Sequence, residues 1–130
     1  MQGYDSFGER LESAIRRVGH SITVGIDPSL ALIPKTFLPE ASSLVRVETF
    51  CRVVLDAVAD LVPVVKLQSA YFELLGGEGI SLMARLALKA KELGVIVIAD
   101  VKRGDIGSTS LAYAEAYLGS DAFISCDAIT

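Results

Sequence analysis

The stretch Val95-Ile96-Val97-Ile98-Ala99-Asp100-Val101-Lys102-Arg103-Gly104-Asp105 runs from an apolar segment directly into a set of charged side chains. Residues 95–99 have the continuous apolar, β-branched character of a parallel strand that is buried on both faces. Burying an ionised group is costly unless the group is paired, so folding alone gives no reason to place charges at the end of such a strand. We therefore interpret residues 100–105 as a functional site. The alternative is a strand end whose charged side chains form salt bridges and are exposed to water at the rim of the sheet.

The alternation of side chains along a strand predicts which side of the sheet the side chains of this site lie on. Alternate residues share a face, so Asp100 and Lys102 should point the same way as Ile96 and Ile98. The other layer of the fold should receive Val95, Val97, Ala99 and Val101. Asp105 lies past the strand, beyond a glycine that allows a tight turn.

Helical patterns alternate with strand patterns along the chain. Apolar residues at helical spacing predict helices over residues 6–18, 44–61, 80–93 and 109–118. Strands are predicted over residues 22–27, over 62–68 and from 95 onward, and a fourth begins at 127 and is cut off partway. The glycine-rich residues 76–79 lack the lysine of a phosphate-binding loop, so they are interpreted as a flexible approach to the third helix. This alternation implies right-handed βαβ units and a parallel sheet.

Charged residues recur at the carboxyl ends of successive predicted strands, namely Asp27, Lys66 and the pair Asp100 and Lys102. A (β/α)8 barrel places its active site on that face, whereas a doubly wound sheet concentrates polar residues at one switch point. The predicted fold is therefore a (β/α)8 TIM barrel, of which this chain supplies about the first four β/α units. A complete barrel needs roughly 250 residues. We expect residues 1–130 to be the N-terminal half of one barrel domain, truncated in strand four, and expect this piece alone to be inactive and to associate through its open sheet edge.

Composition excludes several classes of function. The chain has 130 residues and a net charge of −4, with no basic stripe, which argues against a nucleic-acid or membrane-surface role. No apolar run approaches the roughly 20 residues that span a bilayer. Cys51 and Cys126 are far apart and lack a CxxC partner, so they are interpreted as small buried side chains in a reducing cytoplasm, and a disulfide or metal role is not expected. His20 is interpreted as a loop residue.

The motifs resemble those of the orotidine 5′-phosphate decarboxylase family, in particular the bacterial type 2 branch found in mycobacteria. The resemblance covers all 130 residues in order and is carried by Asp100-x-Lys102-x-x-Asp105-Ile106-x-x-Thr109, Val24-Gly25-Ile26-Asp27-Pro28 and Val64-Val65-Lys66-x-Gln68-Ser69-Ala70-x-Phe72-Glu73. It implies decarboxylation of orotidine 5′-phosphate to UMP, the last step of pyrimidine biosynthesis, without a cofactor.

The resemblance also implies roles for individual residues. The catalytic array would be Lys66, Asp100, Lys102 and Asp105, with Asp27 and Lys66 holding ribose hydroxyls. Asp105, Ile106 and Thr109 would reach the active site of the partner subunit in a homodimer. Asp105 and Thr109 are four residues apart, so they would share a face if that turn is helical. The residues that grip the phosphate would lie outside this chain.

The chemistry gives these residue types a physical reason. Loss of CO2 from C6 of the pyrimidine leaves a carbanion with no adjacent electron sink, so an ammonium must stabilise and then protonate it. Lys102 is the natural donor, because flanking carboxylates keep it charged. Asp100 would either repel the substrate carboxylate in the ground state or belong to a preorganised array that stabilises the carbanion, and the sequence leaves both open.

The sequence leaves two alternative functions open. Magnesium-dependent 3-keto-6-phosphogulonate decarboxylases and hexulose-phosphate synthases share a D-x-K-x-x-D motif, and Glu73 is the only visible candidate for the extra carboxylate that they need. The second alternative is a non-catalytic half-barrel that acts as an assembly module. Such a module would have no reason to keep a whole array of desolvated ions.

Overall fold

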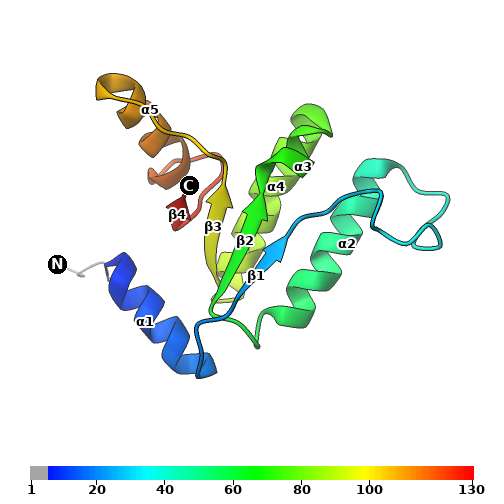
Figure 1. Cartoon of the computed structure of the whole chain (residues 1–130), viewed down its shortest axis with the longest axis horizontal. Helices are drawn as coiled ribbons and strands as arrows, with labels where there is room; N and C mark the ends of the chain where they lie inside the picture. The colour runs from blue at the N-terminus through cyan, green and yellow to red at the C-terminus, as the bar shows by residue number, and fades with distance from the viewer. Residues whose placement is uncertain (1–5) are drawn as a thin grey trace.

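The computed structural model describes residues 6–130 as a parallel sheet with helical crossovers (Figure 1). The strands pair in the order β1-β2-β3-β4, and every pairing is parallel. Each strand therefore lies beside the next strand in sequence, as in consecutive units of a barrel. The elements are α1 (Phe7–Val18), β1 (Thr23–Ile26), α2 (Ser43–Val58), β2 (Val64–Gln68), α3 (Ser69–Glu73), α4 (Gly76–Glu92), β3 (Ile96–Asp100), α5 (Gly107–Leu118) and β4 (Ala128–Ile129).

The predicted strands and helices are all present, with one correction at the glycine-rich residues 76–79. These residues form the first turn of α4 and are not a flexible approach to it. The glycine at position 79 is needed because α3 and α4 meet there: a Cβ on Gly79 would lie 1.9 Å from the carbonyl oxygen of Phe72. Helix α3 was missed from the sequence because five residues are too few to show a helical period.

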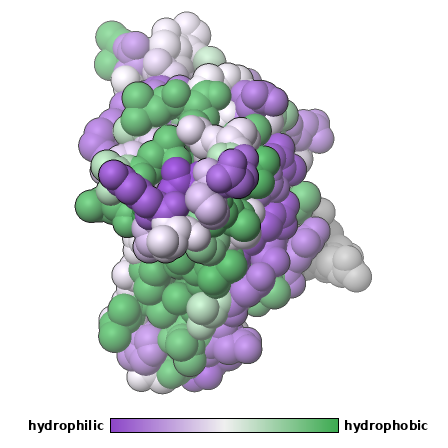
Figure 2. Space-filling view, turned by 90° about the vertical axis from the view of Figure 1, so that its right-hand side faces the viewer, coloured by the Kyte–Doolittle hydropathy of each residue, from purple (hydrophilic) through white to green (hydrophobic). Residues whose placement is uncertain are grey.

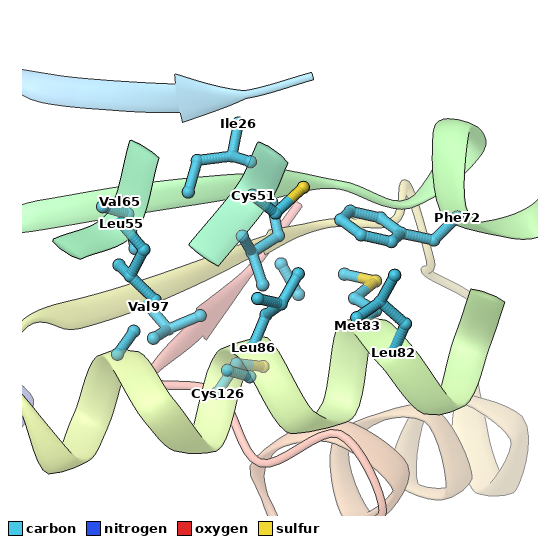
Figure 3. Packing of buried hydrophobic residues seen from close by; sticks show 14 of the residues in the cluster. Ile26, Cys51, Leu55, Val65, Phe72, Leu82, Met83, Leu86, Val97 and Cys126 are labelled. Atoms are coloured by element: carbon cyan, nitrogen blue, oxygen red, sulfur yellow. The ribbon is translucent and has the colours of Figure 1, made fainter. Parts of the chain in front are cut away.

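One face of the sheet packs against α2 and α4 and forms the main core (Figure 3). Val65 and Val97 of the strands meet Leu55 of α2 and Leu86 of α4 within one buried cluster. The strand residues predicted to face this layer are all buried in the structure, namely Val95, Val97, Ala99 and Val101. The predicted alternation of β3 is therefore confirmed on this side.

Both cysteines belong to this core and are free thiols. Burial raises the pKa of the Cys51 thiol to about 12, with a further contribution from nearby Glu48. Burial also raises the pKa of the Cys126 thiol to about 11. These thiols stay protonated near neutral pH and behave as small apolar side chains, as predicted.

The opposite face of the sheet is divided into an apolar and a charged part. Near the start of the strands, Val64 and Ile96 are covered by Ala14 of α1, and Ile98 packs against them. Helix α1 is held there by an ion pair between Arg10 and Asp127, a carboxylate whose other oxygen accepts from the backbone of β3. Beyond this apolar patch, towards the carboxyl ends of the strands, the same face carries polar side chains.

Apolar surface remains exposed at several places outside these cores. Figure 2 shows the side of the molecule on which α2 and the loop before it lie in Figure 1. On this side apolar residues are exposed between hydrophilic ones. On helix α2 the side chains of Val45 and Val53 are exposed. Helix α5 is apolar in composition, yet none of its residues is buried against the rest of residues 6–130. Within the same residues, no helix is both long and apolar enough to cross a membrane.

Candidate active site

Asp100, the last residue of β3, is the centre of a polar cluster. One carboxylate oxygen, Oδ2, accepts from Lys66 Nζ at 3.0 Å and from Gln68 Nε2 at 2.9 Å. The other oxygen, Oδ1, accepts from Thr130 Oγ1 at 2.9 Å and from Lys102 Nζ. Asp100 is only 9% exposed, so these donors take the place of the water that a surface carboxylate would bind.

The parallel register explains how β2 supplies two of these donors. Gln68 lies directly opposite Asp100 in the pairing of β2 with β3. Lys66 comes two residues earlier in β2 and therefore points to the same face. Its ammonium also lies 3.7 Å from Oδ1 of Asp27, just beyond β1. Three adjacent strands thus deliver charged or polar groups to one place at their carboxyl ends.

Lys102 reaches the cluster by a different route from the predicted one. Strand β3 ends at Asp100, so Lys102 is not placed by strand alternation. Its backbone adopts a left-handed conformation with φ of 52°, and its side chain folds back to pair with Asp100. The predicted proximity of the two charges is confirmed, whereas the predicted extended geometry is wrong. The Lys102 side chain is 71% exposed, which leaves its ammonium open to a bound molecule.

The donors hold the pKa of Asp100 well below its usual range. The hydrogen bond from Lys102 contributes most, followed by those from Lys66 and Thr130, and they outweigh the opposing effect of burial. The carboxylate therefore stays ionised throughout the neutral pH range. With Asp27 included, the cluster contains two ammonium groups and two carboxylates, so its formal charges balance.

The structure brings together some of the predicted site residues and separates the others. Asp27, Lys66, Asp100 and Lys102 form one connected group. The other three predicted residues, Asp105, Ile106 and Thr109, are exposed and contact none of these charges among the contacts of residues 6–130.

The segment after the cluster also corrects an expectation about Asp105 and Thr109. Helix α5 begins at Gly107 with Ile106 as its N-cap residue, so Asp105 lies before the helix and does not share a helical face with Thr109. The carboxylate of Asp105 accepts instead from the backbone N–H of Ile106 at 2.7 Å. Ile106 is 85% exposed, so its side chain packs against nothing else in residues 6–130.

Sequence reasoning missed two members of the cluster, Gln68 and Thr130. Gln68 could have been found from the two-residue spacing Lys66-x-Gln68, because both side chains must share one face of a strand. Thr130 follows a strand whose register with β3 the sequence does not reveal, since a short strand fixes its pairing only through tertiary contacts. Its hydroxyl could not have been placed beside Asp100 from the sequence.

A cavity of ≈ 450 Å³ opens beside the cluster, lined among others by Asp27, Asp100 and Lys102. Glu73, the carboxylate considered as a metal ligand, lies on the cavity wall and pairs with Arg103 at 3.4 Å. Among residues 6–130 no group of three or more His, Cys, Asp or Glu side chains is arranged to hold a metal ion. In this structure the ionic partner of Glu73 is therefore an arginine.

Fold and site together define a class of protein: a parallel β/α barrel unit with a lysine–aspartate cluster at the carboxyl ends of its strands. Residues 21–127 match the family described as "Orotidine 5'-phosphate decarboxylase / HUMPS family". The chain belongs to this family.

Curated relatives agree with this assignment. The chain is 45% identical over 124 residues to the orotidine 5′-phosphate decarboxylase of Nocardioides sp., covering 95% of this chain and 44% of the relative. It is 46% identical over 121 residues to that of Rhodopirellula baltica, covering 88% of this chain and 40% of the relative. The chain thus spans less than half the length of these relatives and matches their N-terminal part.

Solved structures confirm the predicted fold. A crystal structure from Streptomyces avermitilis, described as an orotidine 5′-phosphate decarboxylase, superposes with a TM-score of 0.85 at 37% identity, covering 98% of this chain and 44% of that one. The UMP synthase of Leishmania donovani gives a TM-score of 0.75 at 25% identity, covering 97% of this chain and 24% of that one. The sheet described here is therefore part of a (β/α) barrel.

Proposed function

We propose that this chain carries the lysine–aspartate site with which orotidine 5′-phosphate is decarboxylated to UMP. One observation carries the proposal: in a chain of this family, Lys66 and Lys102 both pair with the ionised Asp100 beside an open cavity at the carboxyl ends of the strands. Active sites of β/α barrels lie on that face. An ion cluster there serves chemistry, since it contributes little to stability that apolar packing could not supply.

The proposed reaction uses the ammonium of Lys102 as an acid. The bond between C6 of the pyrimidine and its carboxylate breaks, CO2 leaves, and the electron pair remains on C6. Lys102 then donates a proton from Nζ to C6, which gives UMP, and the neutral amine regains a proton from water. Asp100 keeps the ammonium charged and fixed before the reaction, so little reorganisation is needed when negative charge develops on C6.

The remaining members of the cluster orient the substrate in this proposal. Asp27 lines the same cavity and Lys66 pairs with it, so the two can hold ribose hydroxyls, as an acceptor and a donor respectively. Binding of the substrate phosphate is assigned to residues outside this chain. This agrees with the chain covering less than half the length of its relatives. Residues 1–130 would then be the N-terminal half of a single barrel domain.

We also propose that the active site is shared between two subunits of a cytoplasmic homodimer. Asp105, Ile106 and Thr109 are exposed, and the apolar helix α5, which contains Thr109, has no buried residue within the described part of the chain. Across a two-fold axis each subunit would give and receive the same contact. The free, buried cysteines are compatible with a reducing compartment.

The test uses a completed protein, in which residues 1–130 are followed by the part of the Nocardioides decarboxylase beyond its matched segment. The assay follows the loss of orotate absorbance as orotidine 5′-phosphate is consumed. We expect turnover that persists after exhaustive dialysis against EDTA, and loss of turnover in a Lys102→Ala control. Activity that disappears with EDTA and returns with magnesium would assign the site to the metal-dependent branch. A folded protein without decarboxylation would favour the assembly module.

A further inference from the structure

Thr130 connects the end of β4 to both of the charges at the end of β3. Its hydroxyl donates to Oδ1 of Asp100 at 2.9 Å and accepts from the backbone N–H of Lys102 at 3.2 Å. Its own backbone is fixed as well: its N–H donates to Ala99 at 3.2 Å, and its carbonyl accepts from Arg103 at 2.9 Å. The residue thus holds the chain on both sides of the turn that contains Lys102.

The turn needs such support because of its conformation. Lys102 has φ of 52°, a left-handed conformation that is sterically unfavourable for a residue with a Cβ. This conformation folds the side chain back onto Asp100 and aims the backbone N–H at β4. The hydroxyl oxygen of Thr130 accepts a hydrogen bond from that N–H. Its single O–H donates to the carboxylate of Asp100.

We infer that Thr130 is a positioning residue for proton transfer, because its hydroxyl holds Lys102 in the left-handed turn and so keeps the ammonium against Asp100. The inference rests on the proposed decarboxylation. It assigns to Thr130 no contact with the substrate. It predicts that removal of the hydroxyl alone changes the chemical step more than it changes substrate binding.

The two oxygens of Asp100 are supported from opposite sides, which makes the effect of Thr130 separable. Strand β2 supplies both donors to Oδ2, Lys66 and Gln68. Oδ1 depends on Thr130 and on Lys102, whose placement itself depends on Thr130. Loss of the hydroxyl should therefore leave Asp100 anchored to β2 while Lys102 becomes free to turn away.

The experiment compares Thr130→Val, which keeps the shape of the side chain without the hydroxyl, with Thr130→Ser, which keeps the hydroxyl. Both are made in the completed protein. We expect Thr130→Val to lower kcat by roughly 10²-fold with little change in KM, since small misplacements of a reacting group have effects of that order. Thr130→Ser should restore most of kcat.

A second readout does not depend on activity. Amide hydrogen exchange of Lys102, measured by NMR, should be faster in Thr130→Val than in the parent and should be slow again in Thr130→Ser. Equal loss of kcat in both variants, or unchanged exchange at Lys102 in Thr130→Val, would overturn the inference. If the completed parent protein does not decarboxylate orotidine 5′-phosphate, the proposed function fails, while the exchange data still decide whether the hydroxyl holds the turn.

Discussion

Replacing Gly79 by alanine tests whether α3 and α4 are as closely packed as the structure has them. A Cβ at this position would lie 1.9 Å from the carbonyl oxygen of Phe72 and 2.6 Å from Cβ of Leu75. Both distances are far inside van der Waals contact, and the first involves backbone that cannot rotate away. The matched control is Gly77→Ala in the same helical turn, where a Cβ would meet nothing within 4 Å.

The expected magnitudes follow from packing and helix propensity. Overpacking a close contact costs about 1–3 kcal/mol, and the rigid backbone at Phe72 puts Gly79→Ala at the upper end. Replacing a helical glycine by alanine returns about 1 kcal/mol, so Gly79→Ala should lower the free energy of unfolding by about 2 kcal/mol. Gly77→Ala gains helix propensity without a steric clash, so it should raise the free energy of unfolding by about 0.5–1 kcal/mol.

Urea denaturation of the completed protein, followed by circular dichroism, measures both variants. The midpoint should fall for Gly79→Ala and rise slightly for Gly77→Ala. A Gly79→Ala protein as stable as its parent would refute the close packing of α3 on α4. Little change in either variant would refute the assignment of the glycines to the first turn of a helix, because a flexible loop would tolerate both substitutions alike.

Three further predictions concern the charged cluster. Lys102→Ala should abolish turnover while UMP binding measured by calorimetry persists. The side chain of Lys102 is largely exposed, so its removal should leave the protein folded, and loss of folding instead would show that Lys102 has a structural role. The lowered pKa of Asp100 stabilises the folded protein at pH values above the ordinary aspartate pKa of about 4, and this stabilisation is lost as the pH falls below that value. The unsubstituted protein should therefore lose stability in acid more steeply than Asp100→Asn, as thermal melts across pH 2–7 would show. Mixing inactive Lys102→Ala and Asp105→Ala subunits should restore activity, because one site of a mixed dimer inherits neither lesion; a mixture that stays inactive despite proven subunit exchange would place Asp105 in its own subunit's site.

The order of strands and helices could be predicted from the sequence because one strong pattern recurs. The apolar run before Asp100 fixes both the strand and the alternation of its faces, and the structure confirms the buried face residue by residue. Charges after successive strands likewise had to meet at one edge of a parallel sheet, which brings Lys66 to Asp100. These conclusions need only local periodicity and the handedness of βαβ units.

The details that escaped prediction depend on tertiary contacts. The glycines at 76–79 are typical of a loop by composition, and only the approach of α3 explains why Gly79 stands inside a helix. The left-handed turn at Lys102 is stabilised by Thr130, which comes 28 residues later in the chain. No local pattern marks either feature, because the partner that justifies each conformation comes from another element.

The attachment of α1 has a consequence for how the chain is made. Arg10 pairs with Asp127, a partner 117 residues further along the chain. A ribosome that adds about 5–20 residues per second needs about 6–23 s to reach that partner after Arg10 has been incorporated. The apolar side chains of Leu11 and Ala14 that finally cover Val64 and Ile96 have no complete docking site during that interval. Helix α1 is therefore made before the sheet that it covers but is secured only after it, and its apolar face is open to chaperones while the sheet is still being assembled.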